Sequence, residues 1–169
     1  MDFLELARKR CSVRAYKSTP VEDEKLRYIV EAARMAPTGS NRQPFQLIVI
    51  HTRGREAELR PIYNKDWFVQ APVVICACAT PIPDRSRPEG RRYVEADVAI
   101  VMDHLILAAT DLGLGTCWIG AFNPGAVREI LGLPAEVKPV VLATVGYSGD
   151  GARPKVRKSI DELVRYEHW

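Results

Sequence analysis

The chain has 169 residues, 47% of them hydrophobic and 27% charged, which is enough apolar material for the core of one globular domain. Its formal net charge is +3 with the basic residues spread along it, which argues against a nucleic-acid-binding arm or a polybasic membrane tether. No apolar run approaches the roughly 18 residues that span a bilayer. We expect a single domain over residues 1–169 that works in the cytoplasm, with neither nucleic acid nor membrane as a partner.

The first predicted elements are two helices. Apolar residues recur at helical spacing over 2–9, where Asp2 can cap the N-terminus. A second helix is predicted to run to about Met35. Thr19 and Glu22 give its start a capping-box pattern, and the proline that follows Thr19 suits the first helical position.

The middle of the chain predicts two strands and one weak helix. The polar loop 37–44 leads into 45–51, FQLIVIH, which has the composition of a strand. After a weaker helical stretch at 54–61, the continuous apolar run at 73–79 predicts a buried strand. Prolines and charges then mark an exposed connection at 81–90.

The longest helical pattern covers 92–112 and is apolar on more than one face, so most of its surface must be covered. The remaining predicted elements are a brief strand at 117–120, a helix from Asn123 to Gly132, a buried strand at 140–147 and a terminal helix opening at Ser159. Strands and helices alternate without a regular βαβ rhythm. This order indicates an α+β fold with a central sheet packed against helices.

The four cysteines, at 11, 76, 78 and 117, have none of the spacings that zinc or iron–sulfur sites require. Cys76 and Cys78 fall in the predicted buried strand, where cysteine behaves as a small hydrophobic residue. We predict no metal site.

The segment RCSVRAY, at 10–16, is the first candidate for chemistry. In an extended backbone, Arg10, Ser12 and Arg14 share one face. Guanidinium groups bond bidentately to phosphate oxygens or to an anionic ring edge and stay charged. The alternative from periodicity alone is a solvated edge strand.

The second candidate is PTGSNRQPF, at 37–45. Asn41 and Gln43 supply both donors and acceptors, as reading the edge of a uracil-like ring requires, and Ser40 adds a hydroxyl. These residue types are also ordinary material for a turn.

The third candidate, LGLGTCWIG at 112–120, lacks the third glycine of a dinucleotide fingerprint and follows a helix instead of opening one. We therefore exclude a Rossmann site. The glycines around this short strand would allow close approach of backbone to a ligand, although packing alone could equally require them.

The fourth candidate, PKVRK at 154–158, precedes the predicted terminal helix. Lys155, Arg157 and Lys158 near a capped helix N-terminus would suit an anion, and a solvated tail is the competing interpretation. The sequence shows no Ser/His/Asp arrangement, paired carboxylates or Walker loop.

Taken in order, these four motifs resemble the nitroreductase family. The resemblance implies an α+β fold with a central mixed, largely antiparallel sheet, in an interlocked homodimer whose two FMN sites are built from both subunits. The long helix at 92–112 would form the core of that dimer, which accounts for its several apolar faces.

The resemblance also implies roles for individual residues. Anchoring of the FMN phosphate and ribityl chain falls to Arg10, Ser12, Lys155 and Arg157, and Arg14 would approach the pyrimidine edge of the flavin. Contacts around the ring fall to Ser40, Asn41, Gln43 and Asn64, together with the backbone N–H groups of Ile119 and Gly120.

The implied activity is that of an FMN-dependent oxidoreductase. NADH or NADPH would give a hydride to flavin N5, and electrons would pass to a small-molecule acceptor such as a nitroaromatic or a quinone in a ping-pong cycle. The flavin would perform the chemistry, which explains the absence of catalytic side chains, with electrostatic support from Arg14. Two alternatives are a flavin-binding or sequestering protein without turnover, and a specialised oxidase or dehalogenase of the same fold.

Overall fold

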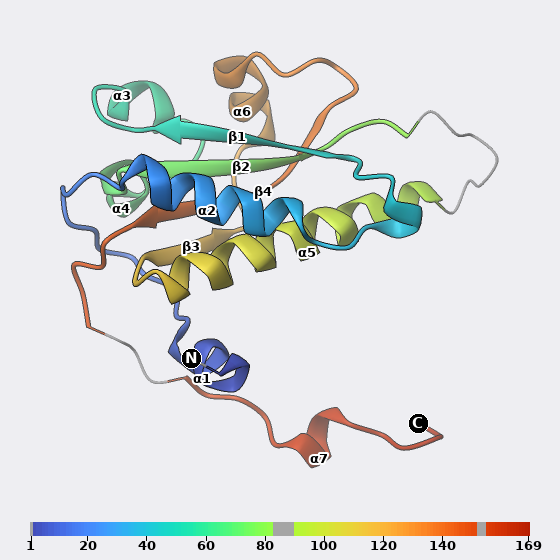
Figure 1. Cartoon of the computed structure of the whole chain (residues 1–169). Coiled ribbons are helices and arrows are strands. Elements are labelled where there is room, and N and C mark those ends of the chain that lie inside the picture. The colour runs from blue at the N-terminus through green and yellow to red at the C-terminus, as the bar shows by residue number, and fades with distance from the viewer. Residues whose placement is uncertain (1, 83–89, 152–154) are drawn as a thin grey trace.

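The computed structural model describes residues 2–82, 90–151 and 155–169. Most of the predicted exposed connection at 81–90, and Pro154 of the basic segment, lie outside the described residues. Four strands form one sheet in the order β1-β2-β4-β3 (Figure 1). Their bounds are β1 Phe45–His51, β2 Val73–Ala79, β3 Gly115–Ile119 and β4 Lys138–Gly146.

Each pair of neighbouring strands is antiparallel. The mixed character predicted for the sheet is therefore confined, in the described residues, to an isolated parallel bridge between Ser12 and Thr116. Both faces of β2 are covered, so every residue of this strand is buried, including Cys76 and Cys78. This confirms the buried strand that the continuous apolar run predicted.

Helices cover the two faces of the sheet. Their bounds are α1 Phe3–Lys9, α2 Asp23–Arg34, the 3₁₀ turn η1 Gly39–Asn41, α3 Glu56–Leu59, α4 Asp66–Gln70, α5 Gly90–Asp111, α6 Pro124–Leu131 and α7 Ile160–Leu163. One core lies between the sheet and α2 with α5, and the other lies between the sheet and α3, α4 and α6. The sequence pattern missed α4, whose five residues are too few to show a helical period.

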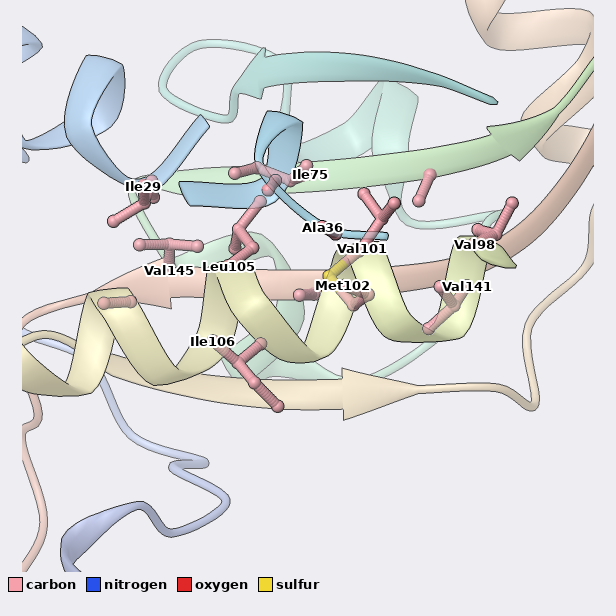
Figure 2. Packing of buried hydrophobic residues seen from close by; sticks show 14 of the residues in the cluster. Ile29, Ala36, Ile75, Val98, Val101, Met102, Leu105, Ile106, Val141 and Val145 are labelled. Carbon is pink, nitrogen blue, oxygen red and sulfur yellow. The ribbon is translucent and has the colours of Figure 1, made fainter. Parts of the chain in front are cut away.

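Helix α5 forms the centre of the first core (Figure 2). Its Val98, Val101 and Leu105 are fully buried against the sheet and α2. The helix nevertheless leaves Tyr93 64% exposed and Ile100 39% exposed, so part of its apolar surface is uncovered in a single chain. None of the helices in the described part of the chain is long and apolar enough to cross a membrane.

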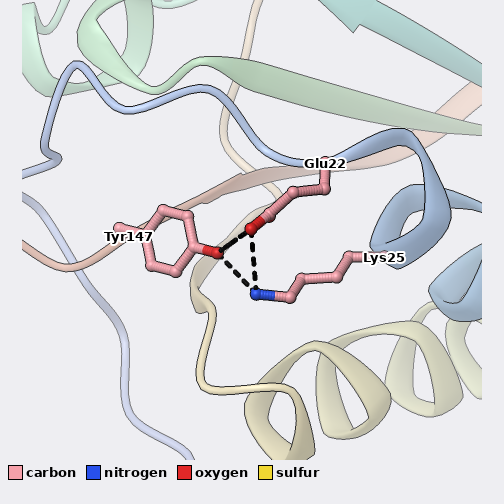
Figure 3. Close-up of polar contacts among 3 residues, drawn as sticks. All are labelled: Glu22, Lys25 and Tyr147. Carbon is pink, nitrogen blue, oxygen red and sulfur yellow. Dashed lines mark hydrogen bonds and ion pairs between the residues drawn. The ribbon is translucent and has the colours of Figure 1, made fainter.

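The start of α2 differs from the prediction. The helix begins at Asp23, and its N-cap residue Glu22 makes no side-chain capping bond. The Glu22 carboxylate instead accepts hydrogen bonds from Tyr147 at 2.8 Å and from Lys25 at 3.3 Å (Figure 3). Because Tyr147 follows β4, a contact distant in sequence replaces the local capping box. The predicted N-terminal cap at Asp2 and the predicted helix start at Ser159 are both confirmed, and each forms a capping box.

Candidate functional site

The 10–16 segment lies beside β3. Ser12 forms its parallel bridge with Thr116, and the Val13 N–H donates to the Thr116 carbonyl at 2.9 Å. This contact explains Gly115, where a Cβ atom would lie 2.7 Å from Val13 Cγ2. Gly120, just beyond the other end of the strand, is exposed, and the nearest neighbour of a Cβ there would be 3.9 Å away. Packing therefore requires Gly115, whereas the backbone at Gly120 is open to a ligand.

Three cations from distant parts of the sequence gather next to this segment. The half-buried Lys155 donates from Nζ to the carbonyl oxygens of Ala7, at 2.8 Å, and of Arg8, in the last turn of α1. Burial lowers the pKa of Lys155, and the nearby guanidinium groups of Arg10 and Arg157 lower that pKa further. We call Arg10, Lys155 and Arg157 the cationic cluster. Positive charges held this close repel one another, so binding an anion between them is favourable.

Arg14 adds a further positive charge beside β3, and Ser12 adds a hydroxyl group. The Cys117 thiol on that strand is 2% exposed, and burial raises its pKa. The Arg14 guanidinium, the Ser12 hydroxyl and the Arg10 guanidinium oppose that rise in the pKa of Cys117. Two of the predicted anchors, Arg10 and Ser12, and the predicted ring contact Arg14 therefore all lie near this one thiol.

A second group of predicted residues lies on the loop 38–43. Ser40, Asn41 and Gln43 all have left-handed backbone, with φ of 53°, 53° and 51°. Non-glycine residues adopt this region at a cost, and such strain concentrates at functional sites. All three side chains are exposed and available to a ligand.

The two groups lie at different places along α5. The 38–43 loop sits at the N-terminal end of this helix, whereas α1 and the following segment lie below its C-terminal half (Figure 1). Asn64 and Gly120 belong to two neighbouring segments, which are joined by a hydrogen bond from the Asn123 N–H to the Ile62 carbonyl at 2.9 Å. A single chain thus presents the predicted residues as separated parts of a site.

A cavity of about 970 Å³ opens elsewhere, between the start of α2 and the C-terminal ends of β1 and α4. Its lining includes Val21, His51, Arg53 and Gln70, and none of the predicted site residues.

Sequence reasoning missed Asp97, which lies 7% exposed on α5 and accepts a hydrogen bond from the Gly39 N–H. The sequence did contain a sign of this role, because Asp97 is a carboxylate within the predicted apolar helix at 92–112, directly before Val98. Thr38 belongs to the second candidate motif but was given no role of its own. Its Oγ1 accepts a hydrogen bond from the Gln43 N–H at 3.0 Å.

Comparison with known proteins agrees with this architecture. The family model described as the nitroreductase family matches residues 7–67 and 54–147. A nitroreductase family protein of Clostridium difficile 630 has a similar crystal structure, with a TM-score of 0.90, 38% identity and full coverage of both chains.

Two curated relatives are more distant. An NADH dehydrogenase of Thermus thermophilus is 27% identical, over 97% of this chain and 95% of its own. An FMN reductase [NAD(P)H] of Bacillus subtilis is 28% identical, over 86% of this chain and 66% of its own. With the family model covering most of the sequence and the whole fold matched at 38% identity, the chain belongs to the nitroreductase family of oxidoreductases.

Proposed function

We propose that residues 1–169 form one FMN-binding domain, and that the protein works as a homodimer which passes electrons from NADH or NADPH to a small-molecule acceptor. The cationic cluster is the observation that carries this proposal. Its cations come from both ends of the sequence, because Lys155 Nζ donates to the carbonyl oxygens of Ala7 and Arg8 at the end of α1. After burial, repulsion from Arg10 and Arg157 lowers the pKa of Lys155. A phosphate with close to two negative charges would relieve that repulsion.

The residues present offer suitable groups for each part of FMN, namely its phosphate, its ribityl chain and its ring. Arg10, Lys155 and Arg157 would hold the phosphate. Ser12 would contact the ribityl chain, and Arg14 would approach the pyrimidine edge, where a fixed cation stabilises negative charge.

Ring contacts would come from two further regions. Ser40, Asn41 and Gln43 offer hydroxyl and amide groups from the 38–43 loop, and Asn64 offers one more amide. The backbone N–H groups of Ile119 and Gly120 would donate to the ring from the end of β3, where the exposed Gly120 leaves room for it.

A second copy of the chain would bring these regions together. The separation of the 38–43 loop from the cationic cluster supports a site shared between subunits. Apolar side chains of the C-terminal segment, among them Ile160 at 72% and Tyr166 at 83% exposure, also lack cover in one chain. Together with the uncovered part of α5, they provide surface for an interlocked dimer.

FMN, when bound, would supply the hydride-accepting and electron-relaying chemistry. The protein would bind and orient it, stabilise negative charge through Arg14, and leave room for a nicotinamide and then for an acceptor such as a nitroaromatic or a quinone.

The test begins with the purified protein. We expect it to be yellow, its extracted cofactor to be FMN, and the bound flavin to bleach with NADH or NADPH without oxygen. A nitroaromatic should then restore the colour. Bleaching without reoxidation by any acceptor would favour a flavin-binding protein without turnover, and failure with both nicotinamides would exclude them as donors.

A further inference from the structure

One buried carboxylate ties the 38–43 loop to α5. Asp97 is 7% exposed, on the same part of the helix as the fully buried Val98 and Val101. Its Oδ1 accepts a hydrogen bond from the Gly39 N–H at 3.0 Å. A Cβ atom at Gly39 would lie 3.7 Å from Asp97 Oδ2, so the loop backbone passes directly over the carboxylate. Burying a carboxylate among apolar residues is costly unless hydrogen bonds compensate it.

The loop that this bond holds is strained. Ser40, Asn41 and Gln43 keep left-handed backbone without being glycine. Such conformations persist only where surrounding contacts enforce them. Contacts inside the loop contribute, since Thr38 Oγ1 accepts from the Gln43 N–H at 3.0 Å and Gln43 Nε2 donates to the Asn41 carbonyl at 3.2 Å. They shape the turn, and the hydrogen bond from the Gly39 N–H to Asp97 fixes the turn to the helix.

We propose that Asp97 is a positioning residue for the flavin ring. It would hold the 38–43 loop in the strained conformation in which Ser40, Asn41 and Gln43 face the ring. This inference rests on the proposed function, because it takes that loop as a ring contact. It adds a residue on the apolar helix that governs ring binding without touching the ring.

The first measurement compares FMN and riboflavin affinity in Asp97→Ala and Asp97→Asn. Losing a charge-assisted hydrogen bond should weaken both ligands by the same factor, roughly ten- to hundredfold in Asp97→Ala. Asp97→Asn keeps an acceptor oxygen, so its loss should be smaller. Asp111→Asn makes the same change at an exposed position on the same helix and should bind both ligands like the parent.

The second measurement is hydrogen exchange in the flavin-free protein, which reads the loop independently of any ligand. Asp97→Ala should speed exchange at Gly39 and across 38–43 and leave the β2 amides protected. Thr38→Val, which removes only the contact to Gln43 within the loop, should change exchange and affinity in the same direction, so the test does not depend on one variant.

Three results would contradict the proposal. Unchanged hydrogen exchange at the Gly39 amide in Asp97→Ala would show that Asp97 does not hold the loop. Faster exchange with unchanged affinity for FMN and riboflavin would show that the loop does not position the ring. Faster exchange throughout the sheet would reduce Asp97 to a general stability role. The proposed function fails separately, if the parent protein itself binds no FMN.

Discussion

The two parts of the candidate site hold their side chains by different means. The cationic cluster consists of long charged side chains, and burial, followed by repulsion from Arg10 and Arg157, lowers the pKa of Lys155. The 38–43 loop instead uses short polar side chains on a left-handed backbone that hydrogen bonds keep in place. We infer that charge prepares one part for an anion and that backbone strain prepares the other for a ring. The two parts should therefore respond differently to salt, to loss of the phosphate and to mutation.

The largest expected effect concerns the phosphate. Arg10→Ala or Arg157→Ala should weaken FMN binding roughly ten- to hundredfold, because each charge-assisted hydrogen bond is worth about 1.5–3 kcal/mol. Affinity for riboflavin, which lacks the phosphate, should hardly change, and raised salt should narrow the gap between the two ligands. Titration of the flavin-free protein measures both. Equal losses of affinity for FMN and riboflavin would contradict the assignment of these arginines to the phosphate.

A backbone substitution should affect the other part of the site. Ser40→Val puts a β-branched residue at φ 53°, so we expect the free energy of unfolding in urea to fall by about 1–3 kcal/mol. Ser40→Gly removes the same hydroxyl without this strain and should be as stable as the parent or more stable by up to about 1 kcal/mol. Equal stability of the two variants would mean that the backbone at this position carries no strain.

Titration of Lys155 gives a smaller and directional effect. Its pKa is lowered in the folded state, so the unfolded state binds more protons and the flavin-free protein should gain stability as pH rises through that pKa toward the ordinary lysine value of about 10.4. Arg10→Ala should raise the pKa of Lys155, as should phosphate binding. Carbon-13 NMR of the lysine Cε measures this. If the pKa of Lys155 is the same in Arg10→Ala as in the parent, the two side chains do not interact.

The smallest effect is expected outside both parts of the site. A hydrogen bond from the backbone lowers the pKa of Glu22, and the Tyr147 hydroxyl and Lys25 lower it further. The corresponding stability is present above the ordinary glutamate pKa of about 4.3 and is lost as pH falls through the lowered value. Tyr147→Phe should raise the pKa of Glu22, measured by NMR, and leave FMN affinity unchanged. Weaker FMN binding in this variant would extend the site to α2.

The elements with local signals were predictable from sequence. The segment 45–51 has the composition of a strand and 73–79 is a continuous apolar run, and the caps at Asp2, Asn123 and Ser159 use local hydrogen bonds that the residue pattern encodes. The start of α2 was wrong because Glu22 is engaged by Tyr147, and no local pattern contains that contact.

The candidate site was predictable in its residue types and less so in its support. Charge made Arg10 and Lys155 candidates for binding an anion, and the family resemblance implied that role, although their proximity depends on how the chain ends meet beside β3. Asp97 was hidden in an apolar helix, since its partner is a backbone N–H 58 residues away. The left-handed φ angles of the 38–43 loop fall on non-glycine residues and carry little sequence signal.

The central claim is that one subunit supplies the cationic cluster of each site and the other supplies the 38–43 loop. Mixing two defective variants tests it directly. One carries Arg10→Ala with Arg157→Ala, and the other carries Asn41→Ala with Gln43→Ala. If each site draws on both subunits, a mixed dimer has one intact site, and random exchange should restore parental FMN affinity to about a quarter of all sites. Mixed dimers that form, as mass spectrometry of differently tagged chains would show, without regaining any high-affinity site would contradict the account.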